Sequence, residues 1–150
     1  MSKHEIINET KINFPSYSAN EAFARSVAAS FCAQMNPTFD ELSDIKCAVS
    51  EAVTNCIVHA YKDKCGTIYI SGKMFDDSTV EIKIKDHGCG IEDVKKAMEP
   101  LYTTDTSGER GGMGFAIMSS FTDKLNIRSS IGKGTTVTMT KRIKNNANDI

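Results

Sequence analysis

An apolar residue recurs every three or four positions from Leu42 to Ala60, and this pattern constrains the fold more than any other stretch. Its members are Leu42, Ile45, Val49, Ala52, Val53, Cys56, Ile57 and Ala60. The spacing predicts an amphipathic helix packed on a core. Glu51 and Asn55 are four residues apart, so they lie one above the other beside the apolar stripe. A carboxylate and a carboxamide placed in this way offer a proton acceptor and a hard oxygen ligand to one space.

Length, charge and cysteine content narrow the class of protein. The chain has 150 residues, of which 40% are apolar, and a formal net charge of −1. We expect one domain over residues 1–150 and no direct nucleic-acid binding through bulk positive charge. No apolar run approaches the roughly 18 residues of a membrane span, and no signal segment is visible, so we expect a cytoplasmic protein without membrane contact. The five cysteines lack C-x-x-C spacing, which favours thiols of a reducing compartment over a zinc site.

Two capping-box patterns mark the starts of the first helices. The sequence Ser18–Glu21 predicts a helix that runs to about Met35. Its core side is expected to carry Phe23, Val27, Phe31 and Met35. Arg25 falls nearly opposite Phe23 and is expected to be solvated. The second box, Thr38–Glu41, opens the helix that carries Glu51 and Asn55.

Alternating apolar residues predict a strand followed later by two hairpins. The expected strands cover residues 6–14, 67–74, 80–86, 125–130 and 135–143. Asp86 shares the parity of Val80, Ile82 and Ile84, and Thr135 shares that of Val137 and Met139, so both polar residues are expected to face the core. A buried carboxylate needs a hydrogen-bond donor. Asp86 is therefore expected either to accept a hydrogen bond at the floor of a pocket or to start an Asx turn at the end of the strand.

Glycines and a long polar segment follow these strands. Gly88 and Gly90 come directly after Asp86 and would let backbone and ligand approach closely. Residues 92–110 contain at most a short helix and otherwise predict a loop of the length typical of lids. A glycine-rich turn then feeds a helix near Phe115, an arrangement that suits phosphates but also fits a plain connector.

In chain order these boxes are Glu51-x-x-x-Asn55, Asp86-x-Gly88-x-Gly90, Gly111-Gly112-x-Gly114 and Gly134-Thr135. The set resembles the ATP-binding fold shared by gyrase, Hsp90, histidine kinases and MutL. That resemblance implies a two-layer α/β sandwich, with a mixed or antiparallel sheet covered on one face by helices. The whole chain further resembles the anti-sigma F factor family of spore-forming bacteria, which are serine protein kinases. This second resemblance lies in residues 36–42, 49–55, 99–104 and 112–118.

The resemblance implies nucleotide-binding and catalytic roles for the matching residues. Asn55 would bind a magnesium ion on the phosphates of ATP or ADP, and Glu51 would take or orient the proton of the attacking serine hydroxyl. Asp86 would accept a hydrogen bond from the adenine amino group, supported by Thr135. Arg110 would reach the terminal phosphate or the docked substrate. The remaining nucleotide contacts would come from Gly88, Gly90, Thr103, Thr104, Gly108, Gly111, Gly112, Met113 and Gly114.

Two further residues receive roles from their positions. His59 continues the Glu51–Asn55 stripe by one turn, either near the phosphates or as a satisfied histidine at the core edge. Arg25 matches a position of the protein-binding surface in the family. The family implies a homodimer with two protein partners, a sporulation sigma factor that it inhibits and an anti-anti-sigma protein that it phosphorylates on serine.

Four alternatives remain. An anti-sigma module could bind ATP without kinase activity, in which case Glu51 would be dispensable. The stress-response anti-sigma kinases share the helix boxes but usually lack the Pro-Leu-Tyr-Thr-Thr segment at residues 100–104. A histidine kinase needs a phosphoacceptor histidine on a dimerising hairpin, and a gyrase- or Hsp90-type ATPase needs a further domain.

Overall fold

The computed structural model describes residues 4–62, 64–99 and 114–144. Its elements in chain order are β1 (Ile6–Pro15), α1 (Asn20–Ala33), α2 (Phe39–Asn55), the π-helical turn η1 (Cys56–Ala60), β2 (Thr67–Phe75), β3 (Thr79–Lys85), α3 (Val94–Ala97), α4 (Gly114–Phe121), β4 (Lys124–Ser130) and β5 (Gly134–Arg142). All five predicted strands are present.

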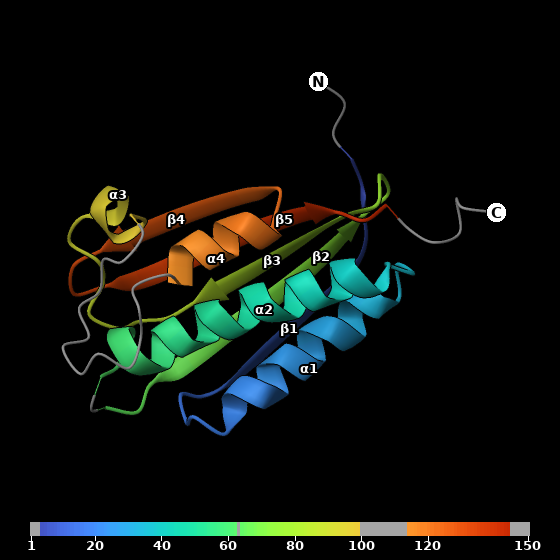
Figure 1. Cartoon of the computed structure of the whole chain (residues 1–150). Helices are drawn as coiled ribbons and strands as arrows, with labels where there is room; N and C mark the ends of the chain where they lie inside the picture. The colour runs from blue at the N-terminus through green and yellow to red at the C-terminus, as the bar shows by residue number, and fades with distance from the viewer. Residues whose placement is uncertain (1–3, 63, 100–113, 145–150) are drawn as a thin grey trace.

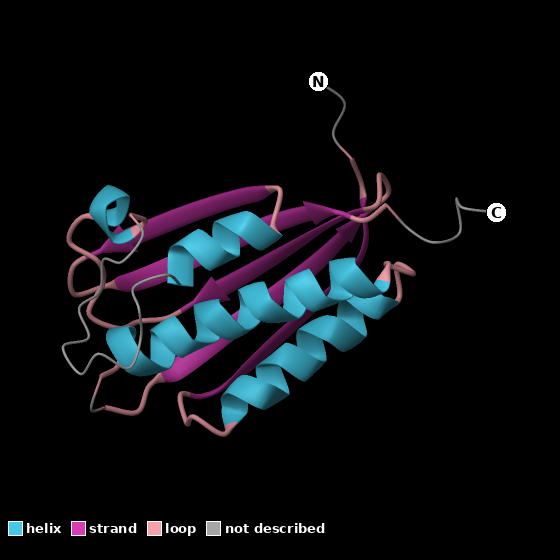
Figure 2. Cartoon of the chain, in the orientation of Figure 1, coloured by secondary structure: helices cyan, strands magenta, loops and turns pink. Residues whose placement is uncertain are grey.

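The strands form one sheet in the order β1-β2-β3-β5-β4, and every neighbouring pair is antiparallel. Helices α1, α2 and α4 lie side by side across one face of this sheet (Figure 1). The same two layers are visible when the chain is coloured by secondary structure (Figure 2). The expected α/β sandwich is therefore confirmed, and the sheet is the antiparallel form of the two that the sequence allowed.

The core lies between the sheet and α2, as the alternation and the helical stripe predict. Along β3 the side chains of Val80, Ile82 and Ile84 are buried. From α2 the buried apolar side chains are Ile45, Ala48, Val49, Ala52 and Val53. Because side chains alternate along a strand, Asp86 and Thr135 lie on the face of the sheet that packs against the helices, and both are buried. The core-facing prediction for these two polar residues is confirmed.

The predicted capping box at the start of α1 is wrong, although the helix begins close to the predicted position. The helix begins after Ala19, which makes no side-chain cap hydrogen bond. Ser18 takes part through its backbone carbonyl, which accepts from the N–H of Glu21 at 3.2 Å. The Glu21 carboxylate instead accepts a hydrogen bond from the hydroxyl of Ser50 on α2. The Glu21 carboxylate that would have completed the capping box is therefore used in a hydrogen bond between α1 and α2.

The predicted core side of α1 is partly wrong. Phe31 is buried, but Phe23 is 51% exposed, and Val27 and Met35 are half-buried. The fully buried positions near the helix start are Ala24 and Ala28. Small side chains let a helix approach its neighbours closely, so alanines line the contact and the larger residues stand at its edge. Phe23 still covers the sheet edge, because its ring packs edge-on against Phe14 with 6.0 Å between centroids.

The second capping box is confirmed, and the helix that it opens ends differently from the prediction. The Glu41 N–H donates to Thr38 Oγ1 at 3.1 Å, and the Thr38 N–H donates to Glu41 Oε1 at 2.9 Å. At Cys56 the hydrogen-bond pattern changes, because the N–H of Tyr61 bonds to the carbonyl of Cys56 at 3.1 Å. A π-helical turn of this kind is wider than an α-turn and is frequent at functional sites.

Within the residues that the structure describes, no helix combines the length and apolarity needed to cross a membrane.

Candidate functional site

The side chain of Asp86 lies at the end of β3 and is only 4% exposed. Its Oδ1 accepts hydrogen bonds from the N–H of Gly88 at 2.9 Å and of Thr135 at 3.1 Å. The Gly88 bond is the Asx turn that the sequence allowed, and the Thr135 bond joins β3 to β5. A buried carboxylate is tolerated because donors surround it. Asp86 is therefore a fixed acceptor on the helix side of the sheet.

Thr135 contacts Asp86 through its backbone N–H, whereas its side-chain hydroxyl contacts a different residue. The hydroxyl of Thr135 lies 2.8 Å from that of Ser129 on β4. The preceding residue must be glycine for two reasons. Gly134 has φ +116, and a Cβ there would lie 2.1 Å from the carbonyl oxygen of Asp86. The start of β5 can thus pass directly against Asp86 only without a side chain at position 134.

Gly88 and Gly90 serve close approach between protein segments. A Cβ on Gly88 would lie 2.4 Å from the carbonyl oxygen of Ala60, and one on Gly90 would lie 2.2 Å from that of Ser130. Gly90 also has φ +80, a conformation that glycine adopts without strain. The segment after Asp86 is therefore held between η1 and the β4–β5 turn. Contact of these glycines with a nucleotide stays a prediction.

The buried thiol of Cys56 is the third donor near Asp86. Its Sγ donates to Asp86 Oδ2 over 3.5 Å. Burial, together with the neighbouring negative charge of Asp86, raises the pKa of this thiol well above its ordinary value. The thiol is therefore protonated at neutral pH and acts as a donor. The sequence pattern placed Cys56 in the core but gave no sign of its partner, because the contact joins residues 30 positions apart.

Tyr61 ties the end of η1 to the same loop. Its hydroxyl donates to the carbonyl of Thr67 at 2.6 Å and accepts from the N–H of His87 at 2.7 Å. Burial raises the pKa of this phenol, although the hydrogen bond from His87 opposes the shift. The ring also occupies the space beside Gly66, where a Cβ would lie 2.2 Å from it. Sequence reasoning missed this residue, because a tyrosine at a helix end carries no distinctive local signal.

Glu51 and Asn55 face the first residue of α4. A Cβ built on Gly114 would lie 3.2 Å from both Oδ1 and Nδ2 of Asn55, and 3.4 Å from Oε2 of Glu51. Both side chains are half-buried. The N-terminus of α4, which carries the positive end of the helix dipole, therefore lies against a carboxylate and a carboxamide. These oxygens are hard donors of the kind that Mg²⁺ accepts, so the donor set fits the implied metal.

The predicted site thus divides into two parts joined by η1. One part holds Asp86 and Thr135, and the other holds Glu51, Asn55 and Gly114. Cys56 contacts Asp86 and directly follows Asn55 in the chain. His59 is half-buried within η1, where the wider turn removes the simple four-residue spacing that placed it on the stripe.

Seven of the predicted nucleotide-binding residues lie outside the described residues. They are Thr103, Thr104, Gly108, Arg110, Gly111, Gly112 and Met113. The expected lid at residues 92–110 is described only as far as Glu99 and includes the short helix α3, which Asp93 caps by accepting from the N–H of Lys96. The roles of these residues stay predictions.

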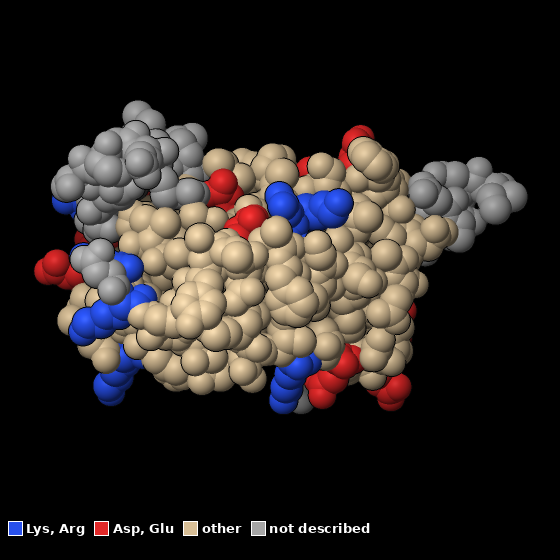
Figure 3. Space-filling model, turned by 90° about the horizontal axis from the view of Figure 1, so that it is seen from below, with Lys and Arg blue, Asp and Glu red and all other residues tan. Residues whose placement is uncertain are grey.

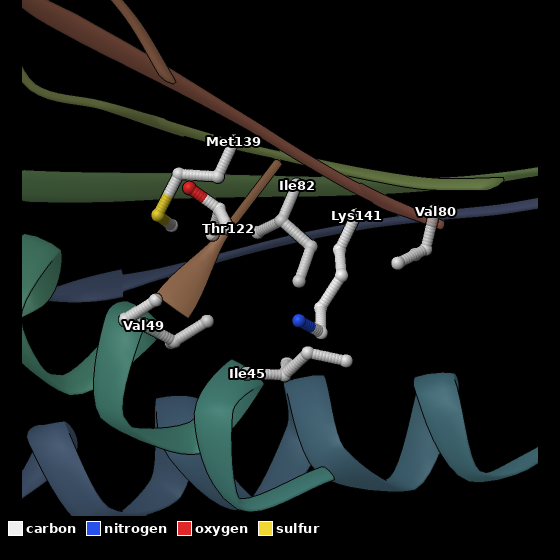
Figure 4. A pocket seen from close by; sticks show the side chains of 8 residues that line it. Ile45, Val49, Val80, Ile82, Thr122, Met139 and Lys141 are labelled. Carbon is white, nitrogen blue, oxygen red and sulfur yellow. The ribbon is translucent and has the colours of Figure 1, made fainter. Parts of the chain in front are cut away.

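A small cavity between α2 and the sheet lies apart from these groups. Its volume is about 10 Å³, roughly what one water requires. Figure 4 shows the Lys141 side chain reaching in among Ile45, Val80 and Ile82. The amine of Lys141 bonds to the carbonyl of Phe121 at 3.2 Å and lies 3.6 Å from a carboxylate oxygen of Asp44. This cavity is a packing feature, and no predicted site residue lines it.

Comparison with known proteins agrees with the geometry. Residues 14–141 match the histidine kinase-like ATPase domain family. The chain is 53% identical to the anti-sigma F factor of Caldanaerobacter subterraneus over 142 residues, which cover 95% of this chain and 99% of that protein. It is 49% identical to the anti-sigma F factor of Bacillus subtilis over 137 residues, which cover 91% and 93% of the two chains.

Solved structures support the fold. The structure of the RsbU and RsbW domains of a Mycobacterium tuberculosis protein superimposes with a TM-score of 0.66 at 20% identity, covering 91% of this chain and 32% of that one. The mycobacterial sensor histidine kinase MprB gives a TM-score of 0.57 at 14% identity, covering 89% and 99%. The fold is therefore that of the histidine kinase-like ATPase domains. Together with the close relatives, it shows that the chain belongs to the anti-sigma F factor family and is built on a histidine kinase-like ATPase domain.

Proposed function

We propose that this chain binds and inhibits a sporulation sigma factor and uses Mg-ATP to phosphorylate a serine of an anti-anti-sigma protein. The observation that carries the kinase part is the contact of Glu51 and Asn55 with Gly114 at the start of α4. It brings a potential base, a metal ligand and a phosphate-binding helix end into one place. A module that bound ATP without transferring phosphate would need the metal ligand and the phosphate-binding helix end, but not the base.

In the proposed reaction the serine oxygen forms a bond to the γ-phosphorus of ATP while the bond to the β-phosphate oxygen breaks. Glu51 accepts or orients the proton that leaves the serine hydroxyl. Asn55 holds the magnesium ion, which supplies positive charge to the phosphates when bound. The N–H groups at the start of α4 donate to phosphate oxygens, and Arg110 supports the terminal phosphate.

At the other end of the nucleotide, Asp86 accepts a hydrogen bond from the adenine amino group. Its Oδ1 already accepts from two backbone N–H groups, which fix the direction of the carboxylate. A fixed acceptor at this position favours adenine over guanine, because guanine presents a carbonyl where adenine presents an amino group.

Arg25 belongs to the surface that receives the sigma factor. It is exposed on α1, and its guanidinium lies 3.9 Å from the carboxylate of Glu21. Two apolar side chains near the start of α1, Tyr17 and Phe23, are also exposed. The face seen in Figure 3 has a broad uncharged area with charged groups of both signs around it. A cation beside exposed apolar side chains suits protein recognition, because the apolar contact contributes affinity and the charge contributes specificity.

We infer that the chain acts as one domain and as a homodimer in the cytoplasm, where ATP and sigma factors occur. The sigma factor and the anti-anti-sigma protein would compete for it. The nucleotide would bias the competition through its different affinities for the two complexes.

The deciding experiment is transfer of labelled phosphate from ATP to the candidate anti-anti-sigma protein, with wild-type chain and Glu51→Gln. We expect phosphoserine with the wild type and a loss of at least about a hundredfold in rate with the variant. The affinity for ADP should be kept, because the amide has the shape of the carboxylate. Transfer that persists in Glu51→Gln would remove Glu51 from the base role, and wild-type binding without transfer would favour the ATP-binding module.

A further inference from the structure

Asp86 has unequal surroundings at its two carboxylate oxygens. Oδ1 accepts from the N–H groups of Gly88 and Thr135, whereas Oδ2 accepts from the thiol of Cys56. An ionised carboxylate offers about four lone-pair positions in all. Among the described residues, Oδ2 therefore keeps room for one more donor, while Oδ1 is occupied.

The thiol that reaches Oδ2 is held by a rigid backbone. Cys56 is the first residue of η1, and its N–H bonds to the carbonyls of Ala52 and Val53. Its own carbonyl accepts from the N–H of Tyr61 at 3.1 Å. The residue is 4% exposed, so its side chain has little freedom. An ordinary thiol is protonated at neutral pH, so the sulfur at 3.5 Å from Oδ2 has a proton to donate.

We propose that Cys56 is a positioning residue for nucleotide selection, whose S–H fixes Oδ2 of Asp86 so that its remaining lone pair faces the amino group of an adenine base. This proposal rests on the proposed function, in which Asp86 reads the base. A carboxylate held by backbone donors on one oxygen can still rock about them. The thiol on the second oxygen removes that freedom, and the acceptor is then fixed before the ligand arrives.

The test compares three variants at position 56 by calorimetric titration with ADP and GDP. Cys56→Ala and Cys56→Val remove the donor, and the valine also fills the volume that the alanine leaves empty. Both are expected to weaken ADP about two- to tenfold, the range for one modest hydrogen bond. GDP does not use this bond, so the preference for ADP over GDP should fall by a similar factor. Cys56→Ser restores a donor and is expected to keep both the affinity and the preference.

Cys32 on α1 provides a matched control. Its thiol is also buried, with 0% exposure. Burial alone raises its pKa to about 12, and no carboxylate contributes to the shift. Cys32→Ala therefore removes a buried thiol without touching Asp86. We expect this variant to bind ADP and GDP as the wild type does.

Infrared spectroscopy gives a second readout that does not depend on nucleotide. A hydrogen bond lowers the S–H stretching frequency, so the band lost in Cys56→Ala should lie below the band lost in Cys32→Ala. Equal band positions would overturn the proposal, because Cys56 would then make no hydrogen bond. A lowered band with unchanged ADP affinity and unchanged base preference in both Cys56→Ala and Cys56→Val would overturn it as well. If the wild type binds no adenine nucleotide, the proposed function itself fails, and the selection role of Cys56 fails with it whatever the infrared band shows.

Discussion

Replacing Gly114 by alanine should separate catalysis from stability. Its Cβ would lie 3.2 Å from the amide atoms of Asn55 and 3.4 Å from Glu51 Oε2. Non-bonded contacts are most favourable at roughly 3.5–4.0 Å, so the Asn55 amide must withdraw by a few tenths of an ångström, whereas Glu51 is already close to an ordinary contact distance. A displacement of about 1 Å at a reacting group costs roughly a hundredfold in rate, so a displacement of a few tenths of an ångström costs roughly three- to tenfold.

The same substitution should leave the fold intact or strengthen it. Gly114 is the first residue of α4 and has no left-handed φ, so alanine fits its backbone. Alanine favours a helix over glycine by up to about 1 kcal/mol. The free energy of unfolding in urea is therefore expected to stay equal or to rise, while the single-turnover rate of phosphate transfer falls roughly three- to tenfold.

Gly132→Ala is the matched control, because it should give the opposite result. Gly132 lies in the β4–β5 turn with φ +79, and no atom lies within 4 Å of an added Cβ. Alanine in this conformation costs about 1–2 kcal/mol of stability through backbone strain. The rate of phosphate transfer per folded molecule of Gly132→Ala should equal that of the wild type. An unchanged transfer rate in Gly114→Ala, or a rate that falls only together with stability, would refute the assignment of the α4 start to the reaction.

Three further predictions follow from single contacts. Asp86→Asn should weaken ADP by about 1–3 kcal/mol, since the amide disrupts a buried acceptor; calorimetry measures it, and GDP affinity equal to that for ADP in the wild type would contradict the base-reading role. Arg25→Glu should reduce co-purification with the sigma factor at unchanged ADP affinity, whereas unchanged co-purification would return Arg25 to an ordinary solvated surface. Thr38→Ala should lower the free energy of unfolding by about 1 kcal/mol through loss of the cap of α2, and Thr38→Ser should restore it; equal urea midpoints for all three chains would show that the cap adds nothing.

The sequence predicted the two inward polar residues well and the first helix poorly. Strand alternation is a local rule with a period of two, so Asp86 and Thr135 follow from their neighbours alone. The buried face of α1 depends on how closely it approaches α2 and the sheet. Tight packing selects Ala24 and Ala28, although Phe23 is the more apolar residue. The distance between α1 and its neighbours cannot be read from a sequence pattern.

The contacts around η1 could not be predicted either. Apolar spacing of three and four fits an α-helix through Ala60, and the change to π-helical bonding at Cys56 leaves no mark on that spacing. The Cys56–Asp86 and Tyr61–His87 contacts join segments that are 30 and 26 residues apart. They depend on the final arrangement of helix and sheet. The half of the site that strand parity defines was therefore predictable, and the groups that hold it in place were not.

The antiparallel strand order also determines when, during folding, the part of the site that holds Asp86 and Thr135 can form. Strands β2 and β3 make one local hairpin, and β4 and β5 make another, whereas β3 pairs with β5 across the intervening α3 and α4 segment. Local pairs close early and distant pairs close late, because long loops cost more entropy. The hydrogen bond from Thr135 to Asp86 spans 49 residues and crosses this late junction. A ligand that binds Asp86 would therefore stabilise the docked hairpins, and amide exchange along β3 and β5 should slow when it is present.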